Sequence, residues 1–131
     1  MLKLFFIFIS ALGLFLVIDA LWIGFFGSRW YNQHIPHLMS GKVSVLPAVL
    51  FYLLYIAGMM YFVIMPALDG STPLSHILLR GALLGFFAYG TYDLTNHVFM
   101  KQWPWFITIT DILWGAFVTG VVSMLIVKFF R

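Results

Sequence analysis

This sequence has no cysteine, no glutamate and very few charged residues. Only 8% of its 131 residues are charged and 63% are hydrophobic, whereas about a quarter of the residues of an ordinary soluble domain are charged. The composition therefore excludes a soluble globular protein. The lack of cysteine excludes disulfides, thiolate metal sites, Fe–S clusters and cysteine nucleophiles. The net charge of +3 is too thinly spread to indicate nucleic-acid binding.

Four long apolar stretches make up most of the chain. They cover residues 4–26, 46–68, 74–100 and 105–130. Each is close to the ~20 residues that an α-helix needs to cross a bilayer. Residues 27–45 mix polar and aromatic side chains, which is typical of an interfacial loop in the headgroup layer, with or without a short helix lying flat on the membrane surface. Because the other connections are short, we predict an all-α membrane protein, one domain over 1–131, folded as an up-down-up-down bundle of four transmembrane helices.

An even number of spans places both termini on one side of the membrane. The basic residues on that side are Lys3, Arg80, Lys128 and Arg131, and those on the other side are Arg29, Lys42 and Lys101. Cytoplasmic loops carry the excess of lysine and arginine. We therefore expect the termini to lie in the cytoplasm.

Small residues recur at a spacing of four in three of the predicted spans. Gly81 and Gly85 lie in the third span, and the pairs Ala20/Gly24 and Ala116/Gly120 repeat the spacing in the first and the last. This spacing lets helix backbones approach closely in lipid. All three pairs are predicted to form close-packing surfaces.

Three of the four acidic residues fall inside the predicted spans. These are Asp19, Asp93 and Asp111, and ionisable groups at such positions are costly and are candidates for a functional site. At ~1.5 Å per residue, all three lie roughly 10 Å below the membrane face opposite the termini. They are expected to form one polar layer.

Aromatic and amide side chains share the helix faces and the depth of these aspartates. They are Trp22, Tyr52, Tyr55, Tyr89, Tyr92, Asn96 and Trp114. No lysine or arginine is expected at that depth. The carboxyl groups must then be neutral acids, accept hydrogen bonds from tryptophan, tyrosine and asparagine, or hold a bound cation.

Structural roles compete with a site at several of these positions. Asp111 is an N-cap if the last helix begins there, but Asp19 and Asp93 lie toward helix C-termini, where the macrodipole disfavours an anion. Hydrogen bonding without a ligand remains open for both. His34, His37 and His97 are a weak candidate metal trio and are typical of the interface instead. We predict no metal site.

Four motifs carry a resemblance to a known family. They are Asp19-Ala-Leu-Trp22-Ile-Gly24, the run from Leu50 to Tyr55, Tyr89-Gly-Thr-Tyr92-Asp93-Leu94-Thr95-Asn96, and Asp111-Ile-Leu-Trp114-Gly115. The whole sequence resembles the small bacterial integral membrane proteins grouped as domain-of-unknown-function family 2177. The resemblance implies a four-helix protein of the bacterial cytoplasmic membrane with these motifs as its characteristic positions, and it implies no activity.

The sequence supports three functional hypotheses. In the first, the protein binds a small molecule, lipid or cation in the polar layer, with Asp19, Asp93 and Asp111 as anchors. In the second, it is a membrane enzyme that acts on a lipid or isoprenoid with one aspartate as general acid. In the third, it is an assembly module that forms a homo-oligomer through Gly81 and Gly85. The sequence identifies no cofactor and leaves open whether the protein is an enzyme.

Overall fold

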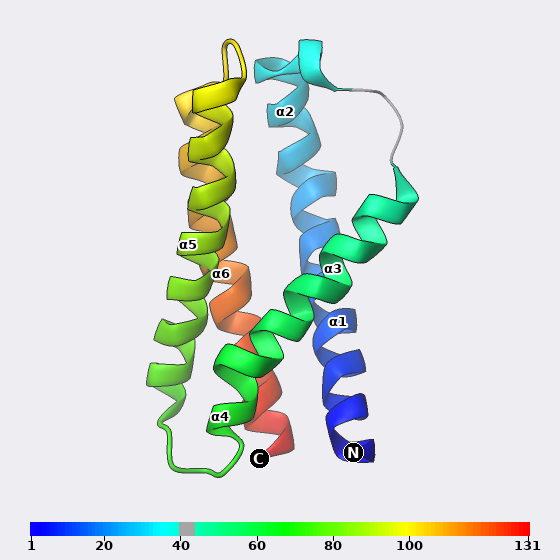
Figure 1. Cartoon of the computed structure of the whole chain (residues 1–131), viewed down its shortest axis with the longest axis vertical. Coiled ribbons are helices and arrows are strands. Elements are labelled where there is room, and N and C mark those ends of the chain that lie inside the picture. Colours follow the sequence, from blue (N-terminus) through cyan, green and yellow to red (C-terminus); the bar gives the residue numbers. More distant parts are fainter. Residues whose placement is uncertain (40–43) are drawn as a thin grey trace.

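The computed structural model describes residues 1–39 and 44–131, and the described chain folds into four long helical rods (Figure 1). The first rod consists of α1 (Leu2–Trp22), the π-helical turn η1 (Ile23–Gly27) and α2 (Ser28–His34). The second consists of α3 (Val45–Met59), the π-helical turn η3 (Met60–Ile64) and α4 (Met65–Ala67). The third and fourth are α5 (Leu74–Phe99) and α6 (Trp105–Phe130), and η2 (Pro36–Leu38) is a short 3-10 turn.

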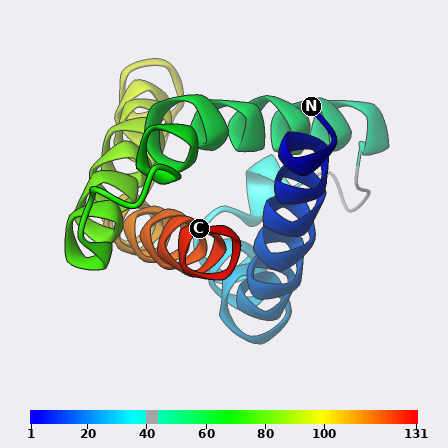
Figure 2. The same cartoon turned by 90° about the horizontal axis from the view of Figure 1, so that it is seen from below.

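Consecutive rods run in opposite directions and both termini lie at the same end of the molecule (Figure 1). The prediction of an all-α, up-down-up-down fold with four helices is confirmed. The second rod crosses the others obliquely, as both views show (Figures 1 and 2). Its contacts with α5 and α6 are concentrated at η3, while α3 packs against α1. The beginning of α3 therefore diverges from the α5–α6 hairpin.

Three of the rods are long and apolar enough to cross a membrane. They are Leu2–His34, Val45–Ala67 and Trp105–Phe130. The remaining rod, α5, has 26 residues and is long enough, but polar residues such as Asp93 and Asn96 lower its hydropathy. That α5 also crosses the membrane remains a prediction.

The first half of the predicted interfacial loop is helical. The helix that begins at Leu2 continues without a break to His34, so the expectation of a loop from residue 27 is wrong for residues 28–34. The helix continues past Gly24 and Gly27, the two glycines that weaken it, through the π-helical turn η1. Residues 40–43 of the predicted loop, Lys42 included, lie outside the described part of the chain.

A second π-helical turn precedes Pro66. A proline inside a helix lacks an N–H donor, and its ring clashes with the carbonyl four residues earlier, here that of Phe62. Because η3 spans Phe62, the wider turn accommodates the ring, and the helix continues through Pro66 to Ala67. The helix ends at Ala67, one residue before the predicted end of this span.

Glycines let α5 and α6 pack backbone against backbone. A Cβ atom built on Gly85 would lie 2.0 Å from the carbonyl oxygen of Gly115, and one built on Gly81 would lie 2.8 Å from the Cα of Gly120. All four glycines are buried, so close packing is present at Gly81, Gly85 and Gly120 as predicted, but Gly115 faces Gly85 where Ala116 was predicted to contribute. This surface is also occupied within the chain, which corrects the hypothesis that Gly81 and Gly85 form a homo-oligomer.

The other predicted small-residue surface does not form. Ala20 and Gly24 are exposed on the outside of the first rod, and a Cβ built on Gly24 has no neighbour within 4 Å. Small residues permit a close approach but do not create one, because the approach also requires a facing helix. The prediction of close packing at Ala20 and Gly24 is therefore wrong.

The apolar core fills the half of the molecule near the termini. Its buried residues come from all four rods and include Phe15, Ile56, Ile77 and Val122. A smaller buried cluster of Ile35, Trp103 and Ile107 closes the opposite end. Large apolar side chains cover the outside, as expected for a surface in contact with lipid. The polar residues lie between the two clusters.

Candidate functional site

A cavity of about 730 Å³ lies between the diverging start of α3 and the other rods. Polar and aromatic side chains make up most of its wall. It is lined by Asp19, Trp22, Ile23, Tyr31, Pro47, Ala48, Phe51, Tyr52, Tyr55, Ala88, Tyr89, Tyr92, Asp111 and Trp114. None of the described residues that line it is a lysine or arginine.

Eight of the ten residues proposed from the sequence line this cavity. They are Asp19, Trp22, Tyr52, Tyr55, Tyr89, Tyr92, Asp111 and Trp114. The other two, Asp93 and Asn96, are buried within α5 and do not line it. The four rods thus bring most of the predicted polar layer to one place.

Asp19 joins three rods through its carboxyl group. One oxygen, Oδ2, accepts a hydrogen bond from the hydroxyl of Tyr52 at 2.5 Å, and the other, Oδ1, accepts one from the indole N–H of Trp114 at 2.9 Å. The carboxyl group is almost completely buried. Hydrogen bonds to donors on neighbouring helices compensate for the loss of water around such a group. Asp19 therefore has a structural role as well as a place in the cavity wall.

Asp111 accepts a hydrogen bond from a residue that was not among the predicted site residues. Its Oδ1 accepts a hydrogen bond from the hydroxyl of Tyr31, which lies in α2. The alternative of Asp111 as an N-cap is wrong, because α6 already begins at Trp105. Asp111 is buried in the second turn of the helix. The segment around Tyr31 was expected to be a loop, so no helical register pointed to it.

The π-helical turn η1 explains how Tyr31 reaches the cavity. Tyr31 follows Asp19 by 12 residues, and at about 100° per residue an unbroken α-helix would direct these two side chains about 120° apart. A π turn takes up one additional residue, which reduces the difference to about 20°. Asp19 and Tyr31 consequently lie on the same face of the first rod.

Asp93 has no hydrogen-bond donor within the described part of the chain. Its side chain is fully buried, neither carboxyl oxygen has a partner, and the amide nitrogen of Asn96, one turn later, also has none. The carboxyl group of Asp93 adjoins that of Asp111. Asp93 therefore adds a second buried carboxyl group behind the one that faces the cavity.

Aromatic rings form the remaining wall. The indoles of Trp22 and Trp114 stack with their ring centroids 4.6 Å apart and their planes 8° apart. Gly27 allows this, because a Cβ there would lie 3.2 Å from the Trp22 indole nitrogen. Tyr55 meets Tyr89 edge to face at 6.0 Å. One side of the wall thus consists of two stacked indoles, and that of Trp114 donates a hydrogen bond to Asp19.

Two of the histidines, His34 and His97, stack on aromatic rings of α6. The ring of His34 stacks on Phe106 with centroids 4.6 Å apart, and that of His97 stacks on Trp105 with centroids 3.9 Å apart. His97 also shares a hydrogen bond of 2.7 Å with the hydroxyl of Thr108. Neither ring lines the cavity, and the described residues contain no group of three metal-binding side chains.

The fourth aspartate, Asp69, belongs to the turn between α4 and α5. It accepts hydrogen bonds from the backbone N–H of Ser71 at 2.9 Å and from its hydroxyl at 2.8 Å. These bonds hold the pKa of Asp69 below its usual range. The residue stabilises a turn at the end near the termini and has no connection with the cavity.

The fold and the cavity define the class of this protein, a multi-pass α-helical membrane protein with a polar cavity between its helices. Residues 4–127 match the family model described as Predicted membrane protein (DUF2177), and the chain belongs to this family. The resemblance noted from the sequence motifs is thereby confirmed. No curated protein and no solved structure matches the chain.

Proposed function

We propose that this protein binds a small molecule, lipid or cation in the cavity between α3 and the other rods. The observation that carries the proposal is the convergence of two aspartates with seven tryptophan and tyrosine side chains on a single space of about 730 Å³. This volume lies in the range of small-molecule sites, which are usually apolar pockets with a few well-placed polar groups.

The unequal hydrogen bonding of the aspartates supports a binding role. The two oxygens of Asp19 each have a donor from the protein, whereas Asp111 has a donor at Oδ1 and adjoins the unpartnered Asp93. Acceptors that the protein leaves free at a cavity are available to a ligand. Asp111 is therefore the residue expected to contact the ligand most directly, and Asp19 the one that fixes the wall.

The proposed site lies toward the membrane face opposite the termini. The cavity is lined by the last turns of α1, the beginnings of α3 and α6 and the second half of α5, all of which lie at the end away from the termini (Figure 1). In the bacterial inner membrane, with cytoplasmic termini, this is the outer half of the bilayer. A ligand would then reach the site from the outer leaflet or the periplasm.

Native mass spectrometry of the gently extracted protein tests the proposal. Ala88 lines the cavity, so Ala88→Trp should fill it, and Ala57→Trp is the matched control because Ala57 lies on the exposed surface of α3. We expect additional bound mass in the wild type and Ala57→Trp, and its loss in Ala88→Trp and Asp111→Asn. The same adduct in all four proteins, or in none, would contradict the proposal.

A membrane enzyme is the second candidate, favoured by the adjoining carboxyl groups of Asp93 and Asp111. Two neighbouring carboxyl groups can divide their roles into a proton donor and an anion, as in general acid catalysis on a lipid or isoprenoid. Incubation of membrane lipid extracts with the wild type should then change lipid masses, and Asp93→Asn should not. Identical extracts after both incubations would exclude this candidate.

A further inference from the structure

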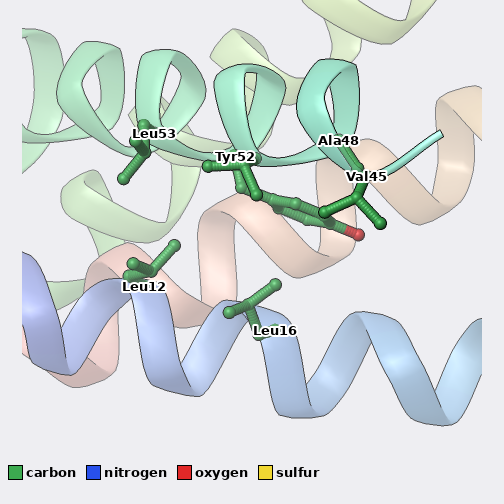
Figure 3. A pocket seen from close by; sticks show the side chains of 7 residues that line it. Leu12, Leu16, Val45, Ala48, Tyr52 and Leu53 are labelled. Atoms are coloured by element: carbon green, nitrogen blue, oxygen red, sulfur yellow. The ribbon is translucent and has the colours of Figure 1, made fainter.

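A second hollow, apolar in character, adjoins the polar cavity. It is a groove of about 300 Å³ between α1 and α3, lined by Leu12, Leu16, Val45, Ala48, Val49, Tyr52 and Leu53. Figure 3 shows leucines of α1 facing the side chains of α3 across this groove. The groove is not needed for the cavity to form or for the helices to cross the membrane.

The groove and the cavity share two residues, Ala48 and Tyr52. Tyr52 separates them, because its ring lines the groove while its hydroxyl donates to Asp19 in the cavity wall. Ala48, the other shared residue, has no side chain beyond Cβ and adds little bulk where the two hollows meet. A molecule with an apolar chain and a polar head can therefore occupy both hollows at once, with the junction at Tyr52.

The charges around the cavity select the head group. Asp19 and Asp111 line it, Asp93 lies behind Asp111, and no described lining residue is a lysine or arginine. A phosphate or carboxylate head would face carboxyl groups, and no described lining residue is a cation that could compensate its charge. An ammonium group supplies three donors and no acceptor, and it is attracted to the faces of tyrosine and tryptophan rings.

We propose that the ligand is a cationic amphiphile, with an ammonium head beside Asp111 in the cavity and a single hydrocarbon chain in the groove between α1 and α3. This inference rests on the proposed function, because it names the class of ligand for the same cavity. It also gives the bound ligand an orientation relative to the membrane. The chain extends from the junction at Tyr52 toward Leu12 and Leu53, that is, toward the membrane centre.

Binding of three matched probes tests the head group. Radiolabelled dodecylamine, dodecanol and dodecanoate have the same chain and differ in charge. The protein is placed in nanodiscs of an uncharged digalactosyl lipid, and binding is the excess over empty nanodiscs. We expect dodecylamine to bind at least about tenfold more tightly than either other probe. Dodecanol or dodecanoate binding as tightly as dodecylamine would overturn the cationic head.

Filling the groove tests the chain. Leu53 lines the groove and is 40% exposed, so Leu53→Trp should obstruct it. Its neighbour Leu54 is 77% exposed and does not line the groove, so Leu54→Trp is the control. We expect Leu53→Trp to weaken dodecylamine binding at least about tenfold and Leu54→Trp to leave it within about twofold. Leu16→Trp fills the groove from α1 and decides the test if Leu53→Trp does not fold.

The outcomes separate this inference from the proposed function. Unchanged dodecylamine binding in both groove variants, together with weaker binding in Asp111→Asn, would overturn the groove and leave the cavity site intact. No excess binding of any probe would overturn the cationic amphiphile. A native mass adduct that is still lost in Ala88→Trp would then show a ligand of another class in the same cavity.

Discussion

Tyr31 connects the end of the first rod to the cavity by a single hydrogen bond to Asp111. The helical faces that identified Trp22 and Trp114 from the sequence assume an unbroken register of about 100° per residue. The π turn η1 changes that register between Asp19 and Tyr31. Tyr31 could be found only by allowing the helix to continue past Gly27 with one additional residue in the turn.

The Tyr31 hydroxyl should contribute measurably to stability. Tyr31→Phe leaves Asp111 buried with one acceptor unpaired, and such a loss costs about 1–3 kcal/mol. Unfolding of the purified protein in a series of detergent mixtures would measure it. Tyr61→Phe is the control, because Tyr61 is exposed on the second rod. If Tyr31→Phe unfolds in the same detergent mixture as the wild type and Tyr61→Phe, the hydrogen bond to Asp111 does not contribute to stability.

Helices were the most predictable elements because length and hydropathy determine them almost alone. The second, third and fourth rods begin and end within about two residues of the predicted ranges. The extension of the first rod to His34 and the oblique course of α3 were not predictable in this way. Both depend on which helices face each other, and local hydropathy does not contain that information. The cavity follows from the course of α3, so its residues were predictable and its shape was not.

The α5–α6 contact is expected to tolerate no additional atom at Gly85. Gly85→Ala places a methyl group against the carbonyl of Gly115, and the helices must separate to admit it. Overpacking of this kind costs typically 1–3 kcal/mol. Gly24→Ala is the matched control, because its Cβ has open space. Detergent unfolding should show a clear loss for Gly85→Ala and none for Gly24→Ala, and equal stability of the two variants would contradict the close packing.

Orientation is a property of the whole molecule, and the lack of native cysteine makes it simple to measure. The turn that contains Ser71 lies at the same end as the termini, and the turn that contains Lys101 lies at the opposite end (Figure 1). In intact bacteria, a membrane-impermeant maleimide should label Lys101→Cys and should label Ser71→Cys only after lysis. The reverse pattern would place the termini outside and the cavity in the cytoplasmic half.

A crystal structure grown from a lipidic mesophase would test the central claim most directly, because it would show the cavity in a membrane-like setting. We expect the start of α3 to remain apart from α5, with non-protein density that touches Asp111. We also expect Tyr31 and Tyr52 to keep their hydrogen bonds to Asp111 and Asp19. An α3 packed closely against α5, with the aspartates bonded only to protein donors, would contradict a binding site.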